Sequence, residues 1–274
     1  MTTPTVADVI AALDERFPPA WAEEWDRVGL VTGEPTASVD TVLCVVDCVP
    51  GTVAQAVDIG AQLVVAHHPL LLRGVSSVAP TTYRGRLIHD LIKNDVALFV
   101  AHTNADVALP GVSDALAARL GLRDLRPLRP SADDPRRGTG RIGRLPAPMT
   151  LTELTTHAAT ALPPTAWGIR AAGDPDQRIE TVAVCGGAGD GFLADAAAAG
   201  VDAYLTADLR HHPASDAVAD GGPALLDAAH WATERPWLDD LADFLRTAVG
   251  VTAVVSDVDT DPWTLHAAQT QEQM

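Results

Sequence analysis

Short apolar segments and alanine-rich amphipathic segments alternate along the chain. In the first half, an apolar run at residues 41–46 is followed by a helical pattern at 52–59 and by a second apolar run at 61–66. Such a sequence predicts a strand, a helix and a strand. Further short apolar runs occur at residues 97–101, 181–184, 203–206 and 224–226. The pattern predicts an α/β protein whose sheets are flanked by helices.

The two halves of the chain repeat this pattern. The segment TVLCVVDCVPGTVAQAVDIGAQLVVAHHP (41–69) is echoed by TVAVCGGAGDGFLADAAAAGVDAYLTADLRHHP (181–213). Each continues through a helical stretch to a further strand, which ends in AHTNAD (101–106) in the first half and AHWATE (229–234) in the second. We interpret this as an internal duplication that produces two similar α/β units. A metal site is expected in the cleft between them, because clefts between domains are common ligand sites.

The stretch LRPLRPSADDPRRGTGRIGRL (125–145) is rich in proline, glycine and charged residues. This composition is typical of a linker. We therefore expect a first α/β unit at residues 1–127, and a linker and second α/β unit at residues 128–274. The segment after about residue 235 is expected to pack back on the first unit.

Composition limits the classes of partner. The chain has 274 residues, of which 47% are hydrophobic, and 19 basic against 36 acidic residues give a formal net charge of −17. This charge repels anionic polymers and surfaces, so nonspecific nucleic-acid binding and membrane binding are not expected. No run of about 18 apolar residues occurs, and the first residues lack the basic start and apolar core of a secretory signal. We expect a cytoplasmic protein.

Histidines gather where the predicted strands end. Six of the nine do so: His67, His68, His102, His211, His212 and His230. Loops at the carboxyl ends of strands are where open α/β sheets bind ligands. Asp106 follows His102 by four residues, and Glu234 follows His230 by four, a spacing that puts both side chains on one helix face. Alone, such a pair is more typical of a solvated surface, but beside adjacent histidines it indicates a metal site.

The mixture of imidazole and carboxylate ligands suits Zn²⁺, Fe²⁺, Mn²⁺ or Co²⁺, whereas Mg²⁺ and Ca²⁺ prefer nearly all-oxygen ligands. Side chains of adjacent residues on an extended backbone diverge, so His67 and His68 cannot easily reach the same ion. We therefore expect two divalent transition-metal ions per chain, with one of these histidines on each ion.

Seven motifs carry a resemblance to a known family. They are PPAWAEEWDRVGLVTG (18–33), AHHPLL, AHTNAD, GTGRIGRL, VCGGAGD, LTADLRHH and AHWATERP, in this order. The sequence resembles the Nif-three-like family of dinuclear-metal proteins, also described as type 2 homologues of GTP cyclohydrolase I. The resemblance implies a homo-oligomer, namely a hexameric ring.

Matching motifs imply the ligand set His67, His68, Asp106, His230 and Glu234, with Glu234 as the bridge between the ions. The sequence departs from the family pattern at Arg27, Ala105 and Ala229, where Asn, Leu and Gly are usual, and none of these changes removes a ligand.

Three histidines are candidates for catalytic roles. His102 could orient a ligand, and His211 and His212 could act as acid, base or phosphate contact. A structural role for His211 is an equal alternative.

Two functions follow from these patterns. The first is a metal-dependent hydrolase that uses a metal-bridging hydroxide, for which the resemblance implies a purine nucleotide as substrate. The second is a non-catalytic metal-binding protein with a regulatory or chaperone-like role. A phosphate-bearing ligand would need local positive charge, which the metal ions and Arg27, Arg210 or Arg235 could supply. The sequence leaves both functions open.

Overall fold

The computed structural model describes residues 3–267. Its α-helices are α1 (Val6–Arg16), α2 (Pro50–Asp58), α3 (Tyr83–Lys93), α4 (Thr103–Asp106), α5 (Val112–Arg119), α6 (Leu151–Ala161), α7 (Leu193–Ala199), α8 (His211–Ala219), α9 (His230–Glu234) and α10 (Trp237–Ala248). Its strands are β1 (Gly29–Thr32), β2 (Thr41–Val45), β3 (Leu63–Ala66), β4 (Ala97–Val100), β5 (Arg123–Pro130), β6 (Gly138–Thr150), β7 (Arg170–Ala172), β8 (Arg178–Ala188), β9 (Ala203–Ala207), β10 (Ala224–Ala228) and β11 (Thr252–Val255). The 3₁₀ turns η1 (Pro19–Trp21) and η2 (Asp190–Phe192) complete the set. The α/β class expected from the sequence is confirmed.

The chain forms two compact units, and each draws on more than one segment. Unit 1 comprises residues 1–115, 129–140 and 234–260, and unit 2 comprises residues 116–128, 141–233 and 261–274. Residues 234–260 belong to unit 1, where β11 pairs with β2 in parallel. The expected division into a first α/β unit at residues 1–127 and a linker and second α/β unit at residues 128–274 stays a prediction.

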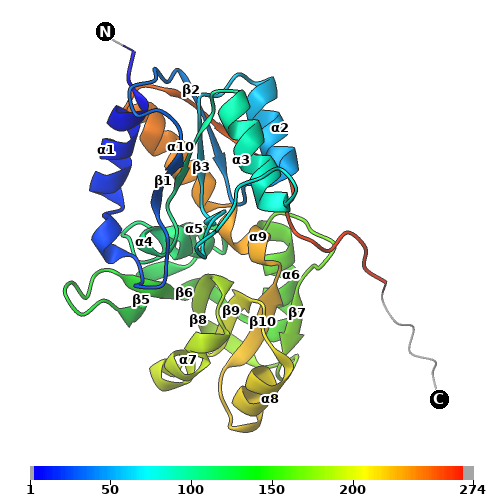
Figure 1. Cartoon of the computed structure of the whole chain (residues 1–274). Helices are drawn as coiled ribbons and strands as arrows, with labels where there is room; N and C mark the ends of the chain where they lie inside the picture. The colour runs from blue at the N-terminus through cyan, green and yellow to red at the C-terminus, as the bar shows by residue number, and fades with distance from the viewer. Residues whose placement is uncertain (1–2, 268–274) are drawn as a thin grey trace. The chain divides into compact units, whose positions relative to one another are not determined.

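Unit 1 holds a five-stranded sheet in the order β1-β4-β3-β2-β11. Strands β11, β2, β3 and β4 run parallel, and β1 is antiparallel to β4. Helices α2 and α3 cover one face of the sheet, whereas α1 and α10 lie on the other (Figure 1). Parallel strands covered on both faces are apolar throughout, and β3 and β4 are buried at every position.

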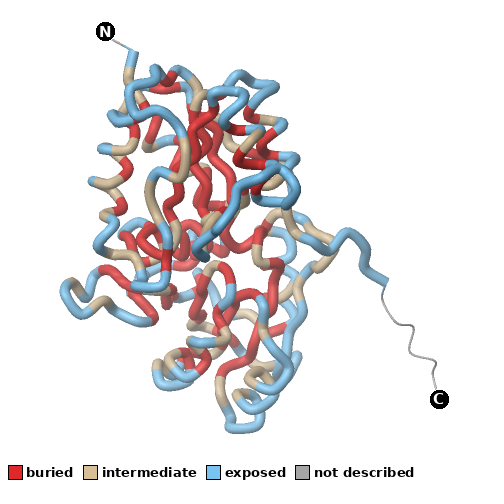
Figure 2. Tube along the Cα trace, in the orientation of Figure 1, coloured by how far each residue is buried: buried red, intermediate tan, exposed pale blue. Residues whose placement is uncertain are grey.

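Unit 2 holds a six-stranded sheet in the order β5-β6-β8-β9-β10-β7. Strands β8, β9 and β10 run parallel, β6 is antiparallel to β8, and β7 is antiparallel to β10. Alternate residues of the central strands contribute to two hydrophobic cores, one on each face of the sheet. Leu154 of α6 packs with Val182 and Leu205 on one face, and Leu193 of α7 packs with Ala183 and Tyr204 on the other. Figure 2 shows the central strands of both sheets buried.

The two units repeat one topology. In unit 1 the strands β2, β3 and β4 are adjacent and parallel, and the preceding β1 pairs antiparallel with β4. In unit 2 the strands β8, β9 and β10 are adjacent and parallel, and the preceding β7 pairs antiparallel with β10. This correspondence supports the inferred duplication, because unrelated sheets would not be expected to share strand order and direction.

The stretch expected to be a linker is instead part of the unit 2 sheet. Residues 123–130 form the edge strand β5, and residues 138–150 form β6 beside it. Prolines are tolerated in an edge strand because one side of its backbone needs no partner. Gly138 is required by close packing, since a Cβ there would lie 2.1 Å from the carbonyl oxygen of Arg129. The stretch thus contains strands where irregular structure was expected, because edge strands and linkers use the same residues, and its role as a boundary between domains stays a prediction.

Within residues 3–267, no helix has the length and apolar character needed to cross a bilayer.

Candidate metal centre

The centre is built on the end of β3. His67 and His68 follow Ala66 directly, and their backbone N–H groups donate to the carbonyls of Val45 (3.0 Å) and Val46 (2.9 Å). The parallel ladder thus continues past the strand and keeps the backbone extended. Adjacent side chains on extended backbone point apart, and accordingly His67 is fully buried whereas His68 is partly exposed.

The end of β4 supplies His102 and Asp106. His102 is the residue before the short helix α4, and Asp106 ends that helix. Buried Asp26 holds this junction by accepting hydrogen bonds from the His102 ring (2.9 Å), from the Thr103 backbone N–H (3.0 Å) and from the Thr103 hydroxyl (2.6 Å). One atom from each of His67, His68 and His102 lies within 4.8 Å of the others, so these three imidazoles could hold a metal ion.

Glu234 brings a carboxylate to the same histidines from the end of α9. Its Oε1 lies 3.5 Å from Nε2 of His67, and its Oε2 lies 3.2 Å from Nε2 of His68. The residue is buried, with 3% of its surface exposed. The two oxygens of one carboxylate thus face two different imidazoles.

The separations around His67 match a metal site better than hydrogen bonds. His67 Nε2 also lies 3.7 Å from Oδ1 of Asp106, and this buried nitrogen has no hydrogen-bond partner among the residues that the structure describes. Two ligand atoms about 2.1 Å from a tetrahedral ion would lie about 3.4 Å apart. The donor atoms are therefore spaced as they would be around an ion, and the residues present fit the metal that their chemistry indicates.

The Nδ1 atom of each of four histidines contacts a backbone carbonyl or a carboxylate. Nδ1 of His67 contacts the Ala101 carbonyl at 2.9 Å, and Nδ1 of His68 contacts Asp47 at 2.8 Å. Nδ1 of His102 contacts Asp26 at 2.9 Å, and Nδ1 of His230 contacts Asp208 at 2.7 Å. Metal-binding histidines usually donate their other N–H to a carbonyl or carboxylate, which fixes the tautomer and leaves Nε2 for the ion. All four histidines follow this pattern.

The electrostatics of the centre favour cations. Burial alone would lower the pKa of His68, but Glu234 and Asp47 raise it to about 10. Burial likewise opposes a charge on His67, yet Glu234 and Asp106 raise its pKa above the usual value. Burial raises the pKa of Asp106, since its histidine neighbours offset the desolvation of the carboxylate only in part. The carboxylates thus stabilise positive charge here, whether carried by protons or by metal ions.

Most of the predicted site residues lie together in the structure, but His211 and His212 do not. It brings together His67, His68, His102, Asp106 and Glu234, all in unit 1. His230 begins α9, one turn before Glu234. His211 and His212 are exposed at the start of α8, and no group of His, Cys, Asp and Glu that could hold an ion includes them among residues 3–267.

Sequence reasoning missed Asp26 and Asp47, the carboxylates that orient His102 and His68. Asp47 follows the end of β2 closely, so a carboxylate near a strand end was the available signal for it, whereas Asp26 stands within the motif at residues 18–33 and follows no strand.

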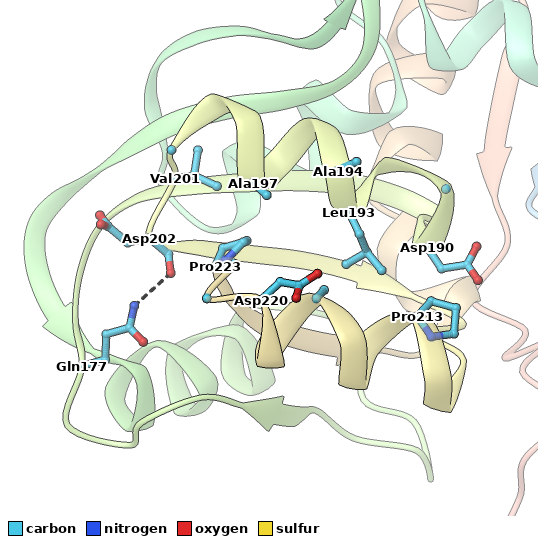
Figure 3. Close-up of a pocket in the computed structure, with 15 residues that line it drawn as sticks. Gln177, Asp190, Leu193, Ala194, Ala197, Val201, Asp202, Pro213, Asp220 and Pro223 are labelled. Carbon is cyan, nitrogen blue, oxygen red and sulfur yellow. Dashed lines mark hydrogen bonds between the residues drawn. The ribbon is translucent and has the colours of Figure 1, made fainter.

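Unit 2 contains a groove of another character. A space of about 820 Å³ lies between α7 and α8, with alanines and Leu193 along its sides and Asp190, Asp202 and Asp220 among its polar residues (Figure 3). No histidine or cysteine lines it. Acidic side chains of this kind occur commonly on protein surfaces, so unit 1 remains the better candidate for the functional site.

Fold and centre together define an α/β protein with a histidine- and carboxylate-rich centre that could hold metal ions. The chain belongs to the Duf34/NIF3 (NGG1p interacting factor 3) family, whose model matches residues 4–262.

A relative from Streptomyces coelicolor named GTP cyclohydrolase 1 type 2 homolog is 55% identical, with 97% of this chain and 95% of the relative covered. A relative of the same name from Mycobacterium tuberculosis is 38% identical, with 95% and 97% covered. A crystal structure described as a Bacillus cereus protein related to NIF3 has a TM-score of 0.90 at 24% identity, covering 97% of this chain and all of that one, and it shows the fold alone.

Proposed function

We propose that the protein is a metal-dependent hydrolase with two divalent transition-metal ions per chain, selected from Zn²⁺, Fe²⁺, Mn²⁺ and Co²⁺. The proposed ligands are His67, His68, Asp106, His230 and Glu234. His230 is included because it stands one turn before Glu234 on α9 and its Nδ1 is already held by Asp208.

The observation that carries the proposal is the position of Glu234. Each of its two oxygens faces the Nε2 atom of a different histidine, at 3.5 Å from His67 and 3.2 Å from His68. A carboxylate in this position suits the bridge between two ions about 3.5–4 Å apart. The imidazoles of His67, His68 and His102 lie close enough to hold one ion by themselves, so the divided contact of Glu234 is what favours two ions over one.

The remaining groups have roles that follow from their contacts. The ions, when bound, would supply Lewis-acid activation of water and of a carbonyl or phosphoryl oxygen. His102 is proposed as the proton carrier, since Asp26 holds its Nδ1 and its ring lies 5.1 Å from the ring of His67 and 5.5 Å from the ring of His68. A catalytic role for His211 and His212 stays a prediction.

Substrate, assembly and location are proposed from resemblance. The name of the Streptomyces coelicolor relative refers to GTP cyclohydrolase, so a purine nucleotide is the proposed substrate. A cytoplasmic homo-hexamer is the proposed form of the protein. The non-catalytic regulatory or chaperone-like alternative uses the same metal ions but predicts no turnover.

The test is a turnover screen of the metal-reconstituted protein against purine nucleotides, with Glu234→Ala as the loss-of-centre variant. Glu180→Ala is a matched control, because Glu180 is a glutamate of unit 2 that pairs with arginines on the surface. We expect turnover that the Glu234 variant loses and the Glu180 variant keeps. Full metal loading without turnover of any nucleotide would reject the hydrolase and favour the alternative. Turnover that persists in the Glu234 variant would reject the centre.

A further inference from the structure

Trp25 is an exposed aromatic side chain beside the candidate centre. Its ring lies 6.0 Å from the ring of His102 at an interplanar angle of 79°, an edge-to-face contact. Although tryptophan is a large apolar residue, 56% of Trp25 is exposed. Exposure alone is not unusual for one tryptophan, but this open indole lies next to a candidate proton carrier, where a ligand can reach it.

The backbone around Trp25 is fixed rather than loose. The neighbouring Asp26 is buried, and its carboxylate accepts hydrogen bonds from His102, Thr103 and the backbone N–H of Arg27. Glu23 donates its backbone N–H to the Thr103 hydroxyl at 3.0 Å. Both sides of Trp25 are thus tied to the junction that positions His102. A preorganised aromatic ring binds a ligand at lower entropic cost than a mobile one.

We propose that Trp25 is the stacking surface for a planar heteroaromatic ring of the substrate, and that Arg27 contacts its anionic group. The proposal rests on the hydrolase function above and assigns one residue to the base and one to the phosphate of the proposed nucleotide. Every nucleobase has a π-face, so a tryptophan platform accepts different bases while holding each ring in place.

Arg27 provides the charge that such a ligand needs. Its side chain is exposed, its guanidinium donates to the carbonyls of Glu24 and Asp26, and no ion pair to it is found within residues 3–267. By contrast, Arg210 pairs with Asp190, and Arg235 pairs with Asp239 and Asp257. Of the three arginines considered from the sequence, only Arg27 therefore keeps its charge uncompensated. Planar guanidinium groups recognise phosphate oxygens well.

Calorimetric titration of the metal-loaded protein with GTP and with inorganic phosphate separates the two contacts. For Trp25→Ala we expect GTP affinity to fall about tenfold, while phosphate affinity and metal content stay within about twofold. Trp25→Phe should keep most of the affinity because it keeps an aromatic face. Arg27→Ala should weaken GTP and phosphate alike. Trp263→Ala is the matched control, since Trp263 is 58% exposed and packs on Trp167 in unit 2.

The outcomes are distinguishable. Wild-type GTP affinity in Trp25→Ala, or an equal loss of GTP and phosphate affinity in that variant, would overturn the stacking role while leaving the hydrolase proposal intact. Metal-loaded wild-type protein that binds neither GTP nor phosphate would overturn the proposed function and the stacking role with it. Loss of metal in Trp25→Ala would show that the residue supports the centre and would also overturn the stacking role.

Discussion

The chain carries two His-His-Pro sequences in corresponding places of two sheets of the same topology, yet they have different surroundings. His67 and His68 follow β3 at once, and hydrogen bonds of the sheet hold their backbone. In the other sheet, Asp208, Leu209 and Arg210 separate the end of β9 from His211 and His212, which begin α8. The first pair faces Glu234, whereas the second is exposed.

The comparison teaches that position relative to the strand end decides what a histidine pair can do. Asp208 occupies the place directly after β9 that His67 occupies after β3, and it adopts a left-handed backbone conformation with φ of 57°. The chain therefore turns away before His211 and enters a helix, where the ladder no longer orients the side chains. The same three letters of sequence thus give a buried cluster in one unit and a helix start in the other.

The largest expected effect concerns metal content. The double variant His67→Ala/His68→Ala should lose both ions, a drop from about two to fewer than about 0.2 per chain, whereas His211→Ala/His212→Ala should keep wild-type content. Elemental analysis after reconstitution gives the numbers. Equal losses in the two double variants would erase the distinction between the pairs.

A smaller effect is expected from the residues that orient the histidines. Asp47→Asn should weaken metal affinity about 10- to 100-fold, because the contact to Nδ1 fixes the orientation and basicity of His68. Asp190→Asn is the control, since Asp190 pairs with Arg210 in unit 2. Competition titration with a chromogenic chelator measures both affinities. Unchanged metal affinity in Asp47→Asn would mean that the contact between Asp47 and His68 does not contribute to metal binding.

Metal uptake should release protons. The pKa of His68 is raised to about 10 in the metal-free protein, so at pH 7 this ring carries a proton that a cation must displace. We expect about one proton or more per chain, and metal affinity that falls as the pH is lowered. Calorimetry in buffers of different ionisation enthalpy counts the protons. No proton release at pH 7 would contradict a ligand role for His68.

The smallest expected effect is on the stability of the metal-free protein. Because folding raises the pKa of His68 from 6.5 to about 10, the stabilisation is complete below about pH 6.5 and is lost as the pH rises toward 10. We expect Tm to fall by roughly a few degrees across this range, and less in His68→Gln than in His212→Gln. Thermal melts followed by circular dichroism measure it. A larger fall in Tm for His68→Gln than for His212→Gln would contradict the assignment of this pH dependence to His68.

Much of the fold followed from hydrophobic pattern alone. The apolar runs at residues 41–46, 61–66 and 97–101 became strands because fully buried parallel strands leave a continuous apolar signature. The strands within residues 125–145 could not be predicted from the pattern, because proline and glycine occur in edge strands as well as in linkers. In the centre, the histidines after strands were recognisable, but Asp26 was not, since its contact to His102 joins residues 76 positions apart.

The most direct test of the central claim is the anomalous diffraction of metal-loaded crystals of the wild-type protein. The account predicts two peaks about 3.5–4 Å apart, one beside Nε2 of His67 and the other beside Nε2 of His68, with one oxygen of Glu234 directed to each. A single peak contacted by both histidines, or peaks at His211 and His212 with none at β3, would contradict the dinuclear centre.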